Sequence, residues 1–157
     1  HRNLQGATLH PDTGQLWETE HGPRGGDEIN LPQAGKNYGW PVITYGREYS
    51  GPAIGEGNAK AGMEQPVHYW VPSTAPSGMT FHSGPGYPAW KGQRFVGALA
   101  ATQLVRMVVT PAGEVQKEER IAIGKRVRDV REGPDGALYV TTTNGDDDKP
   151  LRITPKP

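Results

Sequence analysis

The residues best suited to chemistry lie in a glycine-rich stretch, Thr19–Pro41, which reads TEHGPRGGDEINLPQAGKNYGWP. It holds five glycines and an adjacent acidic pair, Asp27 and Glu28. The dipeptide Gly22–Pro23 favours a sharp turn, and the neighbouring glycines keep Cβ atoms away from it. Such a turn aims two main-chain carbonyls at one cation, and Ca²⁺ binds carbonyl and carboxylate oxygens together. The pattern leaves two interpretations open: a calcium loop, or a surface loop whose acids are only solvated.

A second candidate site is the pair Arg126 and Arg128, in the sequence RVR. Side chains alternate between the faces of a strand, so a strand here places both guanidinium groups on one face and Val127 on the other. Guanidinium groups bind carboxylates through two parallel hydrogen bonds. The pair suits an anionic ligand, but it equally fits an exposed strand face with nearby acidic residues as partners.

Strands must position these residues, because no window keeps a helical apolar period without an interrupting Gly or Pro. Turn residues bound eight short strand-like runs. These are Gly14–Glu20, Pro66–Pro72, Gly78–Ser83, Gln93–Leu99, Gln103–Thr110, Glu114–Ile123, Val127–Gly133 and Gly136–Thr143. The sequence therefore predicts an all-β fold.

An internal similarity narrows this prediction. The segments LHPDTGQLWETE (Leu9–Glu20) and EGPDGALYVTTT (Glu132–Thr143) share the order Pro-Asp, Gly, Leu, aromatic residue. Repeated hairpins of this kind favour a β-propeller, and at about 40 to 50 residues per blade the chain supplies roughly three blades. Three blades do not close a ring. A β-sandwich is the alternative.

Composition excludes several classes of function. The chain has 17 Lys and Arg against 17 Asp and Glu, so no overall field favours nucleic acid. It has no cysteine, which excludes disulfides, thiolate metal sites and a cysteine nucleophile. No apolar run approaches the roughly 20 residues that span a bilayer.

The order of motifs along the chain resembles one family. HRNLQG (His1–Gly6), TEHGPRGGDEINLPQAGKNYGWPVITYG (Thr19–Gly46), APSGMTF (Ala75–Phe81), RVRDVREGPDGALYV (Arg126–Val140) and the closing LRITP (Leu151–Pro155) are similar to motifs of soluble aldose sugar dehydrogenases. These enzymes use pyrroloquinoline quinone (PQQ) and form the glucose/sorbosone dehydrogenase family. The resemblance runs nearly end to end. Because members are six-bladed propellers, it implies that residues 1–157 are a partial domain, the C-terminal half of a propeller.

The resemblance also implies roles for particular residues. Two carbonyls are expected to hold the calcium beside the cofactor, those of Gly22 and Pro23. A second, structural calcium is expected at Glu28 and Tyr38, with Tyr38 contributing its carbonyl. The residues expected to contact PQQ are Arg2, Asn3, Tyr49, Arg126 and Arg128.

The implied reaction is oxidation of an aldose at C1 to a lactone, with electrons passed to an external acceptor. The general-base histidine of the family belongs to a segment before HRNLQG, so we expect no catalytic base in this chain and no activity from the chain alone. The implied location is periplasmic or secreted, with any signal peptide outside this sequence. Expected partners are the missing N-terminal half or a second copy in a homodimer.

One departure weakens the enzymatic interpretation. Relatives commonly place a lysine after the Gly-Ala-Leu turn, and this chain has Ala100 there. A non-catalytic binding or scaffold module derived from a propeller is therefore an alternative. A lectin-like sandwich that binds sugar through calcium at Asp27 and Glu28 is a third.

Overall fold

The computed structural model describes residues 1–84, 86–110, 113–143 and 145–154. In these ranges the chain forms eleven strands and one short 3₁₀ helix, η1 (Pro88–Trp90). The strands are β1 (Leu4–Leu9), β2 (Leu16–Glu20), β3 (Asp27–Asn30), β4 (His68–Trp70), β5 (Pro76–Phe81), β6 (Arg94–Ala98), β7 (Gln103–Val109), β8 (Val115–Ala122), β9 (Val127–Glu132), β10 (Leu138–Thr142) and β11 (Pro150–Ile153). The all-β prediction is confirmed, and each of the eight predicted runs overlaps one of these strands. The described residues contain no helix that is long and apolar enough to cross a membrane.

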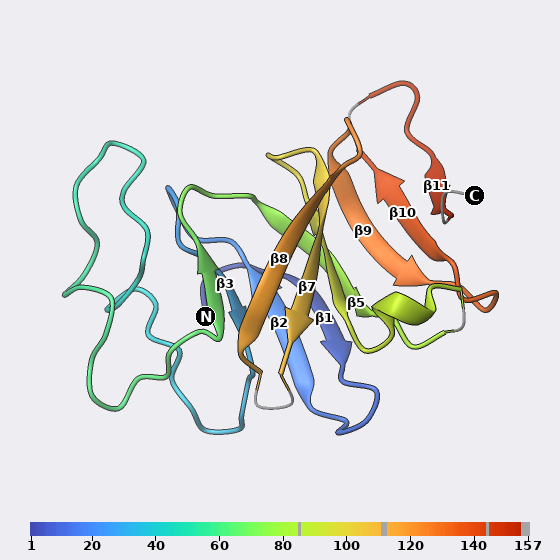
Figure 1. Cartoon of the computed structure of the whole chain (residues 1–157). Helices are drawn as coiled ribbons and strands as arrows, with labels where there is room; N and C mark the ends of the chain where they lie inside the picture. The colour runs from blue at the N-terminus through green and yellow to red at the C-terminus, as the bar shows by residue number, and fades with distance from the viewer. Residues whose placement is uncertain (85, 111–112, 144, 155–157) are drawn as a thin grey trace.

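The strands form three antiparallel sheets whose strands follow chain order: β1-β2-β3-β4, β5-β6-β7-β8 and β9-β10-β11. The first strand of each sheet contacts the first strand of the next, β1 against β5 and β5 against β9. Figure 1 shows the third sheet on one side of the middle sheet and the first sheet on the other. Sheets stacked in series around their first strands form part of a β-propeller, so the propeller prediction is confirmed and the two-sheet sandwich is wrong.

Each pair of neighbouring sheets encloses its own hydrophobic core. The core between the first and second sheets contains Trp17, Ile29, Trp70, Met79, Phe81, Val96, Ala98, Val105 and Met107. The core between the second and third contains Tyr87, Phe95, Leu104, Val127, Val130, Leu138 and Val140. Side chains of β6 enter both cores, with Phe95 in one and Val96 in the other, and β5 lies between β1 and β9, so every residue of β5 and β6 is buried.

Glycines let the first strands of the sheets approach closely. A Cβ on Gly6 of β1 would lie 2.3 Å from the carbonyl oxygen of Ser77 on β5. A Cβ on Gly78 would lie 2.8 Å from the Cα of Asp129 on β9. No larger residue fits without moving the backbone of the neighbouring strand.

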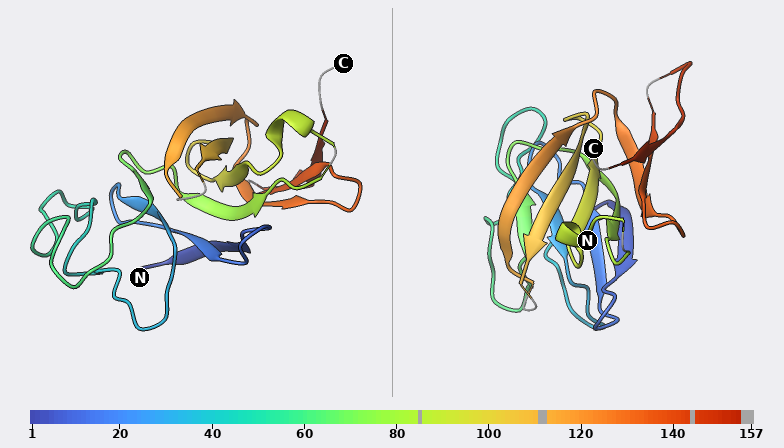
Figure 2. Two further views of the ribbon diagram at one scale, coloured as in Figure 1. Left: turned by 60° about the horizontal axis from the view of Figure 1, so that its bottom comes forward. Right: turned by 45° about the vertical axis from the view of Figure 1, so that its right-hand side comes forward.

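Three strands lie outside the eight predicted runs: β1, β3 and β11. β3 lies inside the glycine-rich stretch, between β2 and β4. After it, residues 31–67 form a long loop that projects from the sheets (Figure 2). This loop is tied back by isolated bridges that pair Arg47 with Arg24 and with Ala53.

Candidate functional site

The carboxylate of Asp27 holds the glycine-rich loop in place. It is fully buried and accepts hydrogen bonds from Gly22 N (2.9 Å), Ser73 Oγ (2.5 Å), Thr74 N (2.8 Å) and Ala75 N (2.8 Å). Four donors satisfy a carboxylate without a metal ion. The sequence left Asp27 open as an ion ligand or a solvated acid, and the structure makes it an anchor of the loop.

The turn that follows β2 leaves two carbonyls free. Gly22 and Pro23 are buried, and their carbonyl oxygens accept no hydrogen bond from any described residue. A Cβ on Gly22 would lie 2.2 Å from the Gly25 carbonyl oxygen, so the turn requires glycine at this position. Gly25 and Gly26 complete the turn with φ values of 76° and 71°. Unpaired main-chain carbonyls in a sharp turn fit the donor set of a calcium site.

A cleft of about 710 Å³ opens beside this turn. The lining residues are His21, Gly22, Pro23, Arg24, Gly25, Arg47, Tyr49, Val71, Pro72, Ser73 and Ala75. The expected cofactor contact Tyr49 is among them and is 70% exposed. Sequence analysis missed the two arginines, whose main chains pair through Arg24 N to Arg47 O (3.0 Å) and Arg47 N to Arg24 O (3.2 Å). They bring two positive charges to the cleft.

Arg2 and Asn3 lie next to the turn through contacts with His21. The Arg2 guanidinium donates to the His21 carbonyl oxygen (2.9 Å) and lies 5.2 Å from the centre of the Trp40 ring. The His21 N–H donates to the Asn3 carbonyl oxygen (2.9 Å). Both residues expected to contact the cofactor are therefore held at the end of β2, where Gly22 follows.

Arg126 and Arg128 flank the buried Val127, as the alternation predicted. Both are exposed, and neither side chain bonds to a described residue. The acidic neighbours considered from the sequence have other partners: Asp129 pairs with Arg131, Asp135 with Arg152, and Glu132 with His82. Two exposed guanidinium groups on one face are available to an anion.

The start of β5 joins these arginines to the calcium-loop candidate. Ser77 Oγ donates to the Val127 carbonyl oxygen (2.7 Å). One residue earlier, the Pro76 carbonyl oxygen accepts from His21 Nε2 (2.6 Å). The turn of the first sheet and the arginines of the third therefore meet at the same end of the inner strands, although neither arginine lines the 710 Å³ cleft.

Glu28 and Tyr38 come together at a small cavity of about 10 Å³, also lined by Arg2, Glu20 and Gly22. The pKa of Glu28 is raised to about 7, chiefly by burial. A hydrogen bond from Asn30 lowers this pKa, and the nearby carboxylates of Glu20 and Glu18 raise it. The Tyr38 hydroxyl donates to the Leu31 carbonyl oxygen (2.6 Å), and the Tyr38 carbonyl accepts no bond from a described residue. A space of this size holds a single water or ion.

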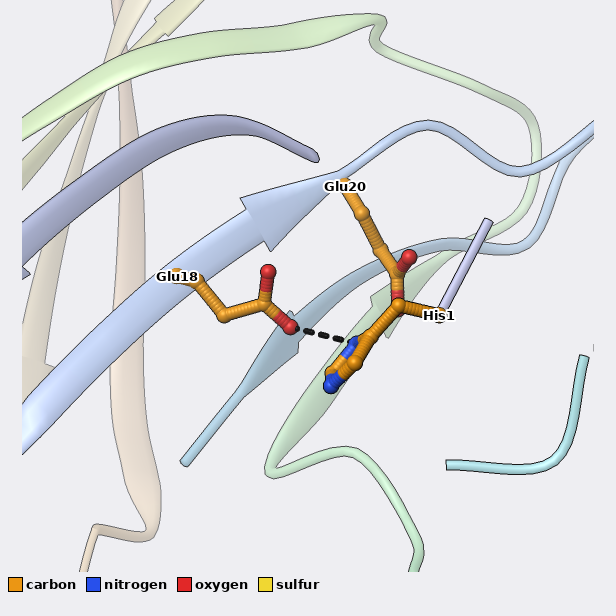
Figure 3. Close-up of side chains that lie close together, drawn as sticks. All are labelled: His1, Glu18 and Glu20. Atoms are coloured by element: carbon orange, nitrogen blue, oxygen red, sulfur yellow. Dashed lines mark hydrogen bonds and ion pairs between the residues drawn. The ribbon is translucent and has the colours of Figure 1, made fainter. Parts of the chain in front are cut away.

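A third group of ligand-type side chains was not singled out from the sequence. His1, Glu18 and Glu20 converge on one face of β2, with one potential ligand atom from each lying within 4.8 Å of the others (Figure 3). Burial raises the pKa of Glu18 to about 7, with a further rise from Glu20. The signal available in the sequence is the alternation of two glutamates in LWETE, which places both on one face.

The fold and this loop belong to a known class of protein. Residues 1–152 match the sequence pattern of the Glucose / Sorbosone dehydrogenase family, and the chain belongs to that family. It is 48% identical over 159 residues to the aldose sugar dehydrogenase YliI of Escherichia coli, covering 99% of this chain and 42% of that protein. It is 33% identical over 109 residues to quinoprotein glucose dehydrogenase B of Acinetobacter calcoaceticus, covering 68% of this chain and 21% of that protein.

Comparison with solved structures points to the same family. A crystal structure of a glucose dehydrogenase superposes with a TM-score of 0.95 at 49% identity, covering 99% of this chain and 46% of that one. The PQQ-bound aldose sugar dehydrogenase of Streptomyces coelicolor gives a TM-score of 0.71 at 26% identity, covering 97% of this chain and 43% of that one. The chain thus spans less than half the length of these relatives.

Proposed function

We propose that this chain is the C-terminal part of a six-bladed propeller enzyme that oxidises aldose sugars at C1 to lactones with PQQ and calcium. Family membership and the PQQ-bound relative support the reaction class. Three sheets in series, with the outer faces of the first and third not covered by another described sheet, support a partial propeller. Residues 1–157 are proposed to form one incomplete domain.

The observation that carries this proposal is the turn at Gly22 and Pro23, with two free carbonyls beside a cleft that holds Tyr49 and two arginines. The carbonyls are proposed to hold the cofactor calcium, and Glu28 with the Tyr38 carbonyl a second calcium. When bound, calcium acts as a Lewis acid on a quinone that accepts hydride from the sugar.

The remaining proposed contacts supply charge and orientation. PQQ carries three carboxylates, and Arg126 and Arg128 offer two guanidinium groups with no competing partner in the described part of the chain. Arg2 and Asn3 are proposed to contact the cofactor from the end of β2. The base that removes the C1 hydroxyl proton is proposed to come from outside the sequence given. An external electron acceptor and a periplasmic or secreted location complete the proposal.

A cofactor titration tests it. PQQ is added to the purified full-length protein and its absorbance followed, once with excess Ca²⁺ and once with a chelator. We expect saturable binding that needs Ca²⁺ and that weakens about 100-fold in an Arg126→Gln/Arg128→Gln variant, because two charge-assisted bonds are lost. Arg120→Gln is the control, since Arg120 pairs with Glu118 on β8.

Two results contradict the proposal. Calcium-independent binding would remove the role of Gly22 and Pro23. Absence of binding in a protein shown to be folded would favour the non-catalytic scaffold module.

A further inference from the structure

The face of β2 opposite the hydrophobic core carries an unusual charge cluster. Glu18 and Glu20 are each 3% exposed, and they pair in register with Asn30 and Glu28 of β3. His1 lies over them, with its ring stacked on Tyr38 at 4.4 Å. Figure 3 shows the Glu18 carboxylate directed at the imidazole, and the Glu20 carboxylate also lies near its Nδ1. Three carboxylates thus share one largely buried surface.

This cluster has too little positive charge. No lysine or arginine of the described residues forms an ion pair with Glu18, Glu20 or Glu28, and among these residues His1 is the one basic side chain paired with the first two. The side chain of Arg2 is directed instead to the His21 carbonyl and the Trp40 ring. Buried carboxylates are costly unless a cation or several donors compensate them.

Glu18 is the clearest sign of a missing ligand. Neither of its carboxylate oxygens has a hydrogen-bond partner among the described residues. Glu18 Oε1 lies 2.8 Å from His1 Nδ1, but the angles do not fit a hydrogen bond. The hydrogen bond of His1 Nδ1 is to Glu20 Oε1, at 3.1 Å. Asn30, fully buried beside them, also leaves its Oδ1 without a partner. Buried oxygens without donors are what a metal ion satisfies.

We propose that His1 Nδ1, Glu18 and Glu20 bind one divalent transition-metal ion, with Zn²⁺ the best match. Tetrahedral Zn²⁺ with bonds of about 2.0–2.2 Å separates neighbouring ligand atoms by roughly 3.3 Å. The two separations from His1 Nδ1, 2.8 Å to Glu18 Oε1 and 3.1 Å to Glu20 Oε1, need to open by only a few tenths of an ångström, and all three ligand atoms lie within 4.8 Å of one another. Each carboxylate is therefore already near metal-ligand spacing from the imidazole nitrogen.

The hydrogen bonds that support Glu20 and the space beside His1 and Glu18 also fit a metal site. The Glu20 carboxylate is oriented by Asn30 Nδ2 on Oε1 (2.8 Å) and by Arg2 N on Oε2 (2.6 Å), the kind of support that fixes a metal ligand. His1 and Glu18 line a cleft of about 390 Å³, which has room for an ion and a bound water. Three protein ligands leave a fourth position open to water from this cleft.

The imidazole separates this site from the proposed calcium sites. Ca²⁺ takes oxygen ligands, whereas imidazole favours Zn²⁺ and its neighbours in the transition series. Glu28 and the Tyr38 carbonyl offer only oxygen. They line a small cavity that Glu20 also lines, whereas His1 and Glu18 line a separate cleft. The inference does not depend on PQQ binding.

The test is a calorimetric titration of Zn²⁺ into metal-free full-length protein in the presence of excess Ca²⁺. We expect one tightly bound equivalent that Ca²⁺ does not displace. Glu18→Gln and His1→Gln each should weaken its affinity by at least about 100-fold, since loss of even a supporting residue costs 10–100-fold. Glu114→Gln, at an exposed glutamate just before β8 that is not one of the proposed ligands, should bind Zn²⁺ as the wild type does.

An independent readout guards against a folding defect in the variants. Co²⁺ in the wild-type protein should give visible d–d absorption bands that Zn²⁺ abolishes, and circular dichroism should show both variants folded. The proposal is overturned if no equivalent binds, or if Zn²⁺ binds equally well to both variants. The proposal is also overturned if Ca²⁺ displaces the bound Zn²⁺ and the Glu28→Gln variant no longer binds Zn²⁺. That result would assign His1, Glu18 and Glu20 to the calcium site.

Discussion

Asp27 and Glu28 are neighbours in the sequence but have different roles in the structure. Successive side chains of a strand point to opposite faces, and β3 directs Asp27 toward the donors of residues 73–75 and Glu28 toward the carboxylates of β2. One acid is saturated with hydrogen bonds, and the other is short of donors. The sequence alone treats them as one acidic pair.

Replacement of Asp27 by Asn is expected to destabilise the protein by about 2–4 kcal/mol, because an amide turns a donor toward buried N–H groups and loses the charge-assisted bonds. Chemical denaturation of the variant measures this loss. Asp12→Asn, at an exposed turn, should change the free energy of unfolding by less than about 0.5 kcal/mol. A similarly small change at Asp27 would show that its four hydrogen bonds contribute little.

The site residues differ in how far the sequence reveals them. The resemblance predicted Gly22, Pro23 and Tyr49, and these line one cleft, while their ligand roles remain predictions. Arg24 and Arg47 were missed because a main-chain bridge from the long loop brings them together, and no local pattern encodes that pairing. The His1 cluster was missed for a related reason, since His1 is 17 residues from Glu18 in the sequence and meets it only through packing.

At the scale of the element, runs with strong β-forming residues and clear turns were predicted well. β3 was missed because Asp, Glu and Asn have poor strand propensity and lie among glycines. Its extended form comes from pairing with β2 on one side and β4 on the other. β1 was missed because Gly6 interrupts a short run, yet that glycine is what the contact with β5 requires.

Substitution of Gly6 by Ala tests the contact between inner strands. The new Cβ would lie 2.3 Å from the Ser77 carbonyl oxygen, and main chain cannot move aside as a flexible side chain does. We expect a loss of about 1–3 kcal/mol in the free energy of unfolding. Ala7→Ser, at the exposed neighbouring position, is the control for thermal and chemical unfolding. Equal stability of the two variants would mean that β1 and β5 are not in close contact.

At the scale of the whole molecule, the middle sheet is covered on both faces and the outer sheets are not. The face of β1 and β2 away from the core exposes Leu4, Leu9 and Leu16 by 55%, 62% and 40%. Leu9 and Leu16 are register partners, so they form a continuous apolar surface. Surfaces of this kind normally pack against another part of a protein, which fits the proposed N-terminal half or a second copy.

The 157-residue chain expressed alone is therefore expected to self-associate. Leu9→Lys together with Leu16→Lys should shift it toward the monomer, because two charges on one face of paired strands oppose packing. Light scattering after size-exclusion chromatography measures the mass. Ala89→Lys, on exposed η1, should leave association unchanged. A monomeric wild-type chain at high concentration would show that this surface needs no partner.

The glycine contacts between β1, β5 and β9 have a consequence for evolution. Because main chain meets main chain at Gly6 and Gly78, covalent geometry rather than side-chain volume sets the spacing of neighbouring sheets there. Core residues farther out can change in size from one homologue to another without altering that spacing. We therefore expect the distance between the turn at Gly22 and the pair at Arg126 and Arg128 to stay the same among homologues whose core residues differ in size.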